Sequence, residues 1–512
     1  MLRHPKYGVW LIGLVIANLA ADRAFANDWP QFLRSAARTG DGANEELELP
    51  LKLSLCVQLD DAVTTSPAVV DGKVYLSVIW HRDVPTERRE LDGRVMRNID
   101  YTHAKFAREF VDRVEAARLK LSPRLRGKAL NEFTEKWMDE HLDADQKLKL
   151  GHYVKKRFTK GRAAIAIKDL DIIGEHEGKM FENHAAFEKW LTALPLSNAV
   201  KEKLRDAVPD TELQADDVVL CLDAATGKTL WKKSMPGQKS ARGAACTPAI
   251  SGGRLYTTGS GNLHCLDAQT GEHRWSSPIK AKSTGSSVLV AGGRVFASAD
   301  TLQAFNAESG SPLWEQKEVK GKNSSPLMAG GTLIASGKKH VYGIDPETGT
   351  AKWEVIGASD ASPVVSDGVL VCYAKGTKLH ALRAYQIGDG EPKPLWNYII
   401  KARRAASSPI AKDGFVYLLG GDRHLCADLK TGKIRWDEER QSSISSPAAA
   451  DGKLFVLENR GGILCMLKET PEDRVELARG KVGALNTCSP AIVGTRLFVR
   501  SKNRVKCFGL GE

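Results

Sequence analysis

Short apolar runs alternate with glycine-containing turns along most of the chain. The segment SPIAKDGFVYLLGGDRHLCADLKTGKIRW, Ser408 to Trp436, shows the pattern most clearly. It has an apolar run after Ser-Pro, an Asp-Gly turn, two further runs, a Thr-Gly turn and a run that carries Trp. Gly permits the positive φ angles of tight hairpin turns, and β-branched and aromatic residues favour strands. The pattern therefore predicts four antiparallel strands in each unit.

The unit repeats along the chain, and a Ser-Pro motif marks the start of each copy. After a long first gap, successive motifs are 39, 39, 37, 46, 38 and 43 residues apart. Four strands in about 40 residues is the period of a β-propeller blade. The proline position of the motif falls at Pro67, Pro248, Ser287, Pro326, Pro363, Pro409, Pro447 and Pro490.

The two ends of the repeat array favour a closed ring over an open solenoid. The last unit, SPAIVGTRLFVRSKNRVKCFGL, supplies three strands and no Trp strand, while LKLSLCVQLD, Leu51 to Asp60, precedes the first Ser-Pro motif without a unit of its own. Pairing these two segments would hide the edges that an open array exposes. The sequence thus predicts an all-β fold, an eight-bladed β-propeller of four-stranded antiparallel blades.

Two positions of the unit recur with characteristic residue types. Five cysteines share one position with three other small residues, which indicates buried, reduced thiols selected for size rather than disulfides. These residues are Cys221, Cys265, Cys426, Cys465 and Cys507, with Ala304, Gly343 and Ala381. The other position holds tryptophans, which we interpret as packing anchors between sheets rather than a surface for stacking a ligand. They are Trp231, Trp275, Trp314, Trp353, Trp396 and Trp436, with Leu55 in the N-terminal strand and no counterpart in the seventh unit.

The first unit is interrupted by a long insertion. Its second strand ends near Trp80 and its third begins at Asp217, about 137 residues later than in the second unit. The inserted residues carry apolar side chains at helical spacing, with Asp143 and Ser197 as predicted N-caps. We expect an α-helical insertion at 82–215 in the first blade, between propeller segments 51–81 and 216–512.

The N-terminus has the pattern of a secretory signal peptide. Basic residues precede an apolar run of about 14 residues and the small-residue site Ala24-Phe25-Ala26, so residues 1–26 are predicted to be removed and 27–50 to form a lead-in. An uncleaved membrane anchor is the alternative, but the run is short for the ~20 residues that span a bilayer. The mature chain is expected to be exported, periplasmic or extracellular, without a transmembrane span.

The net charge of +12 is modest for 512 residues. It fits a nucleic-acid binder, a binder of acidic surfaces or neither. Export from the cytoplasm argues against nucleic acid as a partner.

The motifs SPxxxxGxxY and LDAxTG and the Trp that follows resemble the PQQ-like, or quinoprotein-type, β-propeller repeats. The lead-in DWPQFLRSAARTG is also similar to that of exported members of this repeat family. Such repeats occur in quinone-dependent alcohol dehydrogenases and in BamB, the propeller subunit of the bacterial outer-membrane barrel assembly machinery. The resemblance implies the fold for nearly all of the mature chain outside the insertion, whereas function can differ between proteins of one fold.

For the dehydrogenases, the resemblance implies a quinone beside a calcium ion, a catalytic Asp and a disulfide between adjacent cysteines. The sequence contains neither a Cys-Cys pair nor a Cys-x-x-Cys-His haem motif. The Asp of each repeat precedes a Thr-Gly turn, which indicates a turn cap rather than a calcium ligand. These residues are Asp223, Asp267, Asp345 and Asp428.

One set of cations could form a binding site. The loops before the Ser-Pro motifs carry basic residues that a propeller would bring to one mouth of its central channel, where they would attract an anionic ligand or an acidic protein segment. Ordinary solvated loop charges are the alternative. The residues are Arg242, Lys282, Lys322, Arg403 and Arg404.

Together these patterns favour an exported, non-catalytic binding or assembly scaffold, whose partners are envelope or extracellular proteins. No catalytic, cofactor-binding or metal-binding residue is predicted. One alternative is an oxidoreductase of alcohols or sugars that uses PQQ and calcium, and another is a carbohydrate or polyanion binding protein.

Overall fold

The structure is a computed structural model. It describes residues 28, 30–35, 37–38, 41–42, 52–59, 65–238, 246–280, 285–321, 323–375, 380–400, 406–421, 423–440 and 444–509. The predicted signal peptide lies outside this range. The chain divides into two compact units, one of residues 82–214 and one of the described residues before and after them.

The larger unit is built from repeated sheets whose strands are antiparallel, apart from the parallel pair of β1 (Asp41–Gly42) and β29 (Ala448–Ala450). Within the described residues it has eight such sheets, seven of four strands and one of five, here numbered sheet 1 to sheet 8 along the chain. Sheet 1 contains β3 (Ala68–Val70), β4 (Lys73–Pro85), β7 (Thr211–Asp223) and β8 (Thr229–Pro236), and sheet 2 contains β9 (Ala249–Ser251), β10 (Arg254–Thr258), β11 (Asn262–Asp267) and β12 (His273–Pro278). Sheet 3 contains β13 (Leu289–Ala291), β14 (Arg294–Ser298), β15 (Leu302–Asn306) and β16 (Pro312–Gln316), and sheet 4 contains β17 (Leu327–Ala329), β18 (Thr332–Ser336), β19 (His340–Ile344) and β20 (Ala351–Ile356).

The later sheets follow the same order, with one strand added at each of two edges. Sheet 5 contains β21 (Val364–Ser366), β22 (Val369–Lys375), β23 (His380–Gln386) and β24 (Lys393–Ile400), and sheet 6 contains β25 (Ile410–Lys412), β26 (Phe415–Gly420), β27 (Arg423–Asp428) and β28 (Ile434–Glu439). Sheet 7 contains β1 (Asp41–Gly42), β29 (Ala448–Ala450), β30 (Lys453–Glu458), β31 (Ile463–Lys468) and β32 (Glu476–Lys481), and sheet 8 contains β33 (Ala491–Val493), β34 (Arg496–Ser501), β35 (Arg504–Gly509) and β2 (Lys52–Gln58). The prediction of four antiparallel strands per unit is confirmed.

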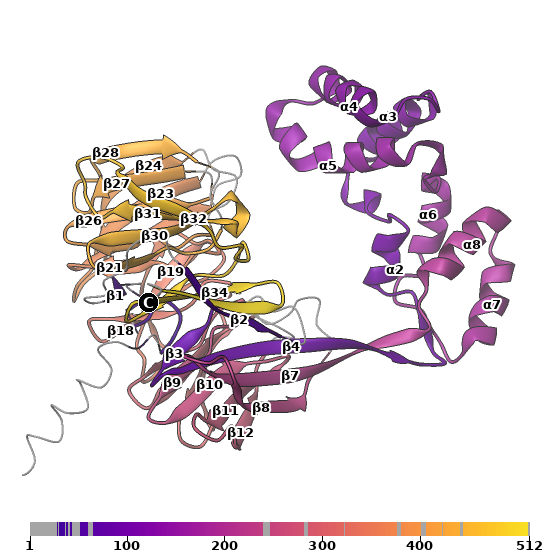
Figure 1. The fold of residues 1–512 in the computed structure, drawn as a ribbon. Coiled ribbons are helices and arrows are strands. Elements are labelled where there is room, and N and C mark those ends of the chain that lie inside the picture. The colour runs from indigo at the N-terminus through magenta and orange to yellow at the C-terminus, as the bar shows by residue number, and fades with distance from the viewer. Residues whose placement is uncertain are drawn as a thin grey trace, which may run out of the picture. The chain divides into compact units, whose positions relative to one another are not determined.

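The N-terminal strand completes the last sheet, as the sequence predicts. β2 pairs antiparallel with β35, and Leu55 lies opposite Cys507. In Figure 1 the indigo β2 lies against the yellow C-terminal strands. The edge strand of the last unit is therefore covered by a segment from the other end of the chain.

Hydrogen bonds of the Ser-Pro motifs connect each sheet to the next. In seven cases the backbone N–H of one motif donates to the serine Oγ of the following motif, and Ser77 Oγ of sheet 1 donates to the Cys246 carbonyl of sheet 2 at 2.7 Å. The seven bonds, 2.8–3.0 Å long, run Thr247 to Ser287, Ser287 to Ser325, Ser325 to Ser362, Ser362 to Ser408, Ser408 to Ser446, Ser446 to Ser489 and Ser489 to Ser66. Because Ser66 belongs to sheet 1, the connections return to their start.

These bonds correct the register of one Ser-Pro motif. The sequence places Ser287 at the proline position, but its Oγ accepts the N–H of Thr247, as the serine before each proline does. Val288, which directly precedes β13, therefore occupies the proline position of sheet 3. The motif of this unit has no proline, so the sequence gives no marker for its register.

Six sheets pair a small residue on the third strand with a tryptophan on the fourth. A Cβ added to Gly343 would lie 2.0 Å from the Trp353 ring, so the third-strand position has no room for a large side chain. The pairs are Cys221–Trp231, Cys265–Trp275, Ala304–Trp314, Gly343–Trp353, Ala384–Trp396 and Cys426–Trp436.

Two predicted members of the small-residue position are wrong. In sheet 5, Ala381 pairs with Ile399, and Ala384 lies opposite the tryptophan. In sheet 7, Cys465 pairs with Arg479, and the position is held by Met466 opposite Ala478. Both units lack the regular Asp-x-x-Thr-Gly turn, so counting residues back from the turn gives the wrong register.

The smaller unit is mainly helical. Its helices are α2 (Gly93–Asn98), α3 (Arg108–Leu119), α4 (Gly127–His141), α5 (Ala144–Lys160), α6 (Ile167–Gly174), α7 (His184–Ala193) and α8 (Asn198–Ala207), with a short β5 (Arg89–Glu90) and β6 (Met180–Phe181) pair (Figure 1). They share one apolar core, which includes Val114, Phe158 and Leu170. No helix of the described residues is long and apolar enough to cross a membrane.

The two predicted N-caps of this unit differ in the structure. Asp143 caps α5 in a capping box, because its carboxylate accepts the Gln146 N–H at 2.9 Å and the Gln146 side chain accepts the Asp143 N–H at 3.1 Å. Ser197 precedes α8, but its side chain makes no capping bond. The reciprocal bonds at α5 require a Gln at the third position of the helix. The third position of α8 is Val200, which cannot form such a bond.

Candidate functional site

The five loop cations fall outside the described residues. Arg242, Lys282, Lys322, Arg403 and Arg404 all belong to stretches that the structure does not describe. The basic binding surface therefore stays a prediction, and the described residues define the candidate site instead.

The described residues between 28 and 42, here called the N-terminal segment, contact residues in or beside the first strands of several sheets. The Asp28 carboxylate accepts the Asp71 N–H of sheet 1 at 3.2 Å, and the Pro30 carbonyl accepts the Ile250 N–H of sheet 2 at 2.8 Å. Strand β1 pairs in parallel with β29 of sheet 7. Because first strands such as β3, β9 and β33 contact one another across sheets, this segment lies at the centre that the first strands share.

Arg38 is the residue of this segment that is held most tightly. It is fully buried, at 0% exposure, and its guanidinium donates to backbone carbonyls. The acceptors are Phe32 at 2.6 Å, Val288 at 2.8 Å, Pro326 at 3.0 Å and Ser287 at 3.4 Å. Arg38 thereby joins the N-terminal segment to sheets 3 and 4.

Burial changes the electrostatics of Arg38. Desolvation lowers the pKa of its guanidinium to about 9, although the group is still protonated near pH 7. Four carbonyl dipoles compensate the buried charge. The sequence gives one signal for this residue, its place in the lead-in DWPQFLRSAARTG, and that signal alone predicts no contact with the sheets.

A cavity of about 620 Å³ lies between sheets 1 and 2, beside their turns. Its lining includes Lys73, Arg254 and Arg274. Arg254 also contacts Glu308, and Arg274 lies 2.9 Å from Asp267. Both guanidinium groups are therefore paired with carboxylates.

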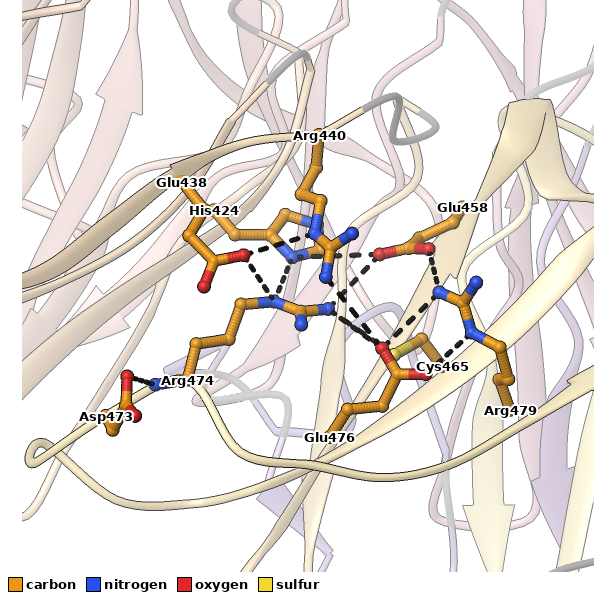
Figure 2. A network of polar contacts seen from close by, with 9 residues as sticks. All are labelled: His424, Glu438, Arg440, Glu458, Cys465, Asp473, Arg474, Glu476 and Arg479. Atoms are coloured by element: carbon orange, nitrogen blue, oxygen red, sulfur yellow. Dashed lines mark hydrogen bonds and ion pairs between the residues drawn. The ribbon is translucent and has the colours of Figure 1, made fainter.

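A network of charged side chains connects sheets 6 and 7 (Figure 2). Arg474, with 2% of its side chain exposed, lies 3.3 Å from Glu458 and 3.4 Å from Glu476. Arg479 donates to Glu458 at 2.6 Å, and Arg474 Nε donates to His424 Nδ1 at 3.3 Å. Nothing in the sequence marks these residues, because Arg and Glu at such positions are typical of a solvated surface.

The network balances its own charge. Burial, together with the charges of Arg474 and Arg440, lowers the pKa of His424 to about 3, so this imidazole is neutral. The three arginines then face three glutamates, which are Glu438, Glu458 and Glu476. We therefore interpret the network as a link between sheets rather than a site for a charged ligand.

The repeated aspartates cap turns, as the sequence predicts. Asp267 accepts the N–H groups of Gln269 at 3.0 Å and Thr270 at 2.9 Å. Asp223, Asp345 and Asp428 accept the equivalent pairs of N–H groups in their own turns. In each of these turns, a carboxylate oxygen is therefore hydrogen-bonded to backbone N–H groups.

Five of the six tryptophans hydrogen-bond to the following sheet. Trp275 Nε1, for example, donates to the Ala307 carbonyl at 3.3 Å. The other bonds join Trp231 to Ala268, Trp314 to Pro346, Trp396 to Leu429 and Trp436 to Thr470. The indole rings span the boundaries between neighbouring sheets.

Comparison with known proteins identifies the family. The family model described as outer membrane protein assembly factor BamB matches residues 215–436, 296–475 and 337–511, together more than half of the chain. The chain belongs to this family of PQQ-like repeat propellers. The predicted family resemblance is thus confirmed.

Curated relatives of this PQQ-like repeat protein have different functions. It is 28% identical to the serine/threonine-protein kinase AfsK of Streptomyces griseus over 45% of this chain and 30% of the kinase. It is 23% identical to tetrathionate hydrolase of Acidithiobacillus ferrooxidans over 49% of this chain and 56% of that protein. With BamB of Moranella endobia it is 22% identical over 56% of this chain and 79% of BamB. The chain thus matches only about a third to a half of the length of the first two.

Solved structures support the fold. A europium-containing methanol dehydrogenase matches 96% of this chain and all of its own, with a TM-score of 0.54 and 10% identity. The quinohemoprotein alcohol dehydrogenase ADHIIG of Pseudomonas putida matches 96% of this chain and 81% of its own, with a TM-score of 0.51 and 12% identity. At these identities the likeness concerns the fold alone.

Proposed function

We propose that this protein is an exported, closed, eight-bladed β-propeller that acts as a binding or assembly scaffold in the cell envelope. The observation that carries the proposal is the N-terminal segment at the shared centre of the sheets. Its Arg38 donates to carbonyls of sheets 3 and 4, while β1 adds to sheet 7. Because part of its own chain occupies this centre, the protein would recognise partners through its outer faces.

The closed ring is supported by two sets of bonds. The serines of the Ser-Pro motifs connect the sheets in sequence and return to Ser66 of sheet 1. The pairing of β2 with β35 covers the edge of sheet 8. Each of the eight sheets would be one blade, so no edge between the first and last blades is left to pair with another chain.

The rival function, quinone-dependent oxidation, fits the residues poorly. The repeated aspartates are engaged by their turns, and in the described part of the chain no three His, Cys, Asp or Glu side chains gather as a metal site would require. A quinone at the centre of the ring would compete with the N-terminal segment. We therefore derive no reaction step through a quinone or calcium.

The BamB relationship suggests the kind of partner. A scaffold of this family would bind envelope proteins that take part in outer-membrane assembly, and the helical unit, residues 82–214, is the element that distinguishes this chain from a bare propeller. We propose that this unit is a docking arm. Its own apolar core is consistent with an independently packed element that can present a surface.

A pull-down from an envelope fraction tests the partner. The tagged full chain is expected to retain barrel-assembly proteins, and a variant with residues 82–214 replaced by the short Gly-Ser-Gly turn of sheet 2 is expected to lose them. Retention by the shortened variant would assign docking to the propeller and overturn the docking arm. Absence of barrel-assembly proteins from both pull-downs would overturn the assembly role.

A cofactor titration tests the rival function. Purified protein mixed with pyrroloquinoline quinone and calcium is expected to show no saturable quenching of tryptophan fluorescence and no oxidation of alcohols or sugars with a dye acceptor. Turnover that depends on both additives would overturn the scaffold proposal in favour of an oxidoreductase.

A further inference from the structure

Sheets 1 and 2 meet at a buried Asp–His pair. Asp217 of β7 and His264 of β11 are each 2% exposed, and His264 Nε2 lies 2.9 Å from Asp217 Oδ2. By comparison, His340 and His424 lie 3.9 and 4.0 Å from the carboxylates of Glu354 and Glu458. A buried carboxylate is stable only when several hydrogen-bond donors surround it. The donors around Asp217 therefore decide whether its carboxylate is fixed beside His264.

The β10–β11 turn provides those donors. Ser260 N–H lies 2.8 and 3.0 Å from the two carboxylate oxygens of Asp217, and Ser260 Oγ lies 2.8 Å from Oδ1. A Cβ on Gly259 would lie 2.0 Å from Asp217 Oδ2, so only glycine fits beside the carboxylate. The turn therefore fixes Asp217 in place, with one oxygen directed to the imidazole.

The other imidazole nitrogen reaches an exposed serine. His264 Nδ1 lies 2.7 Å from Ser276 Oγ, on the neighbouring strand β12. With Nε2–H donating to Asp217, Nδ1 carries a lone pair and accepts the hydroxyl proton of Ser276. A second imidazole, that of His273, lies 2.6 Å from the same Oγ. Ser276 and His273 are exposed, whereas the base and the carboxylate are buried.

We propose that Asp217, His264 and Ser276 form a nucleophilic triad that hydrolyses small acyl esters on the outer edge of the propeller. Ser276 supplies the nucleophile, His264 the general base, and Asp217 orients the imidazole and stabilises its charged form. This activity goes beyond the proposed scaffold function and does not depend on it.

The reaction balances without a cofactor. Ser276 Oγ attacks the ester carbonyl carbon while its proton passes to His264 Nδ1, and the tetrahedral intermediate then expels the alcohol, which takes that proton. Water, deprotonated by His264, attacks the acyl-serine, and the carboxylic acid leaves as the proton returns to Ser276 Oγ. No oxidant or reductant is needed.

His273 can donate a hydrogen bond to Ser276 Oγ, because its Nε2 lies 2.6 Å from that oxygen. Partial desolvation is the largest cause that lowers the pKa of His273, which favours the neutral ring, able to donate through Nε2–H. Its exposure leaves the reacting serine open to solvent. The site therefore suits a small ester that arrives from solution rather than a substrate enclosed in a pocket.

The positions of His264 and Ser276 have equivalents in the other sheets, and these hold different residues. The residues that replace His264 and Ser276 are Gln303 and Glu315 in sheet 3, and Tyr342 and Glu354 in sheet 4. Neither pair combines a serine with a histidine. Only in sheet 2, among the described sheets, does the position combine serine, histidine and a buried carboxylate.

Fluorophosphonate labelling of the full chain tests the triad. The serine hydroxyl attacks phosphorus and displaces fluoride, so intact mass spectrometry is expected to show one adduct, mapped to Ser276 by peptide analysis. Ser276→Ala and His264→Gln are expected to abolish it. Ser234→Ala, at an exposed serine of outer strand β8, is expected to label like the original protein.

Asp217→Asn separates positioning from folding. The labelling rate is expected to fall at least ~100-fold, and p-nitrophenyl acetate hydrolysis is expected to fall with it, while thermal unfolding shows a folded protein. No adduct on the folded original protein, or an adduct that survives Ser276→Ala, would overturn the proposal. Because the pull-down measures docking alone, either proposal can fail without the other.

Discussion

Sheets 6 and 7 fill the same position of the fold in opposite ways. In sheet 6 a small residue, Cys426, lies opposite the large Trp436. In sheet 7 the large residue is Met466 on the third strand, and the small one, Ala478, lies on the fourth. The position therefore accepts the larger residue on either strand, with a small residue opposite it.

The two boundaries also differ in polarity. Trp436 donates to the Thr470 carbonyl of sheet 7 at 3.1 Å, so the boundary of sheets 6 and 7 combines an indole anchor with the charged network of Arg474. The boundary of sheets 7 and 8 has Met466 within an apolar cluster and no indole among its described residues. A tryptophan is thus one solution to sheet packing rather than a requirement of it.

Removing the tryptophan anchor tests the comparison most strongly. Trp436 is only 8% exposed, so Trp436→Ala leaves a cavity and the free energy of unfolding is expected to fall by ~3–5 kcal/mol. Denaturant unfolding followed by circular dichroism measures the change. Trp436→Phe is the matched control, because it keeps most of the ring volume while it removes the indole hydrogen bond to Thr470, worth about 1 kcal/mol. Equal losses for both variants would show that the bond, and not the volume, holds the boundary.

Much of this architecture is readable from the sequence, because each strand and turn has a local residue signal. The Ser-Pro motifs, the Thr-Gly turns and the terminal strands predict the sheets and the pairing of β2 with β35. Register fails where the local signal is missing. Sheet 3 has no proline in its motif, and sheets 5 and 7 lack the regular turn, so Ser287, Ala381 and Cys465 are misassigned.

The site residues are harder to predict for a different reason. Asp217, His264 and Ser276 come from two sheets and three strands, and their meeting depends on how the sheets pack, which no local pattern encodes. Arg38 and the Arg474 network are hidden in the same way, because an isolated arginine is typical of an exposed surface. The loop cations that the sequence favours lie outside the described residues, so they remain a prediction.

Exchanging the two side chains of sheet 7 sharpens the comparison. Ala478→Trp alone is expected to lower the free energy of unfolding by ~1–3 kcal/mol, because Met466 already fills the space. Adding Met466→Cys recreates the pair found in sheet 6 and is expected to recover part of this loss. A double-mutant cycle should give a favourable coupling of at least ~0.5 kcal/mol. Additive effects of the two substitutions would contradict the idea that these two side chains compete for the same space.

The smallest expected effect concerns the turns that follow these positions. Hydrogen bonds from Arg274 and from the turn lower the pKa of Asp267 to about 2 from its usual 3.8. Since the pKa is lower in the folded state, the ionised carboxylate stabilises the fold above about pH 4, and this contribution is lost as the pH falls towards 2. Asp267→Asn keeps an oxygen acceptor for the turn and removes the titration.

Sheet 3 provides the natural precedent for this variant. Its turn is capped by Asn306, whose amide oxygen accepts the N–H groups of Glu308 and Ser309 at 2.9 Å. The stability difference between the original protein and Asp267→Asn, measured by urea unfolding, is expected to shrink between about pH 5 and about pH 2. A difference that stays constant over this range would mean that the turn depends on the acceptor alone, and that the carboxylate charge and its pairing with Arg274 contribute nothing to holding sheet 2 beside its neighbour.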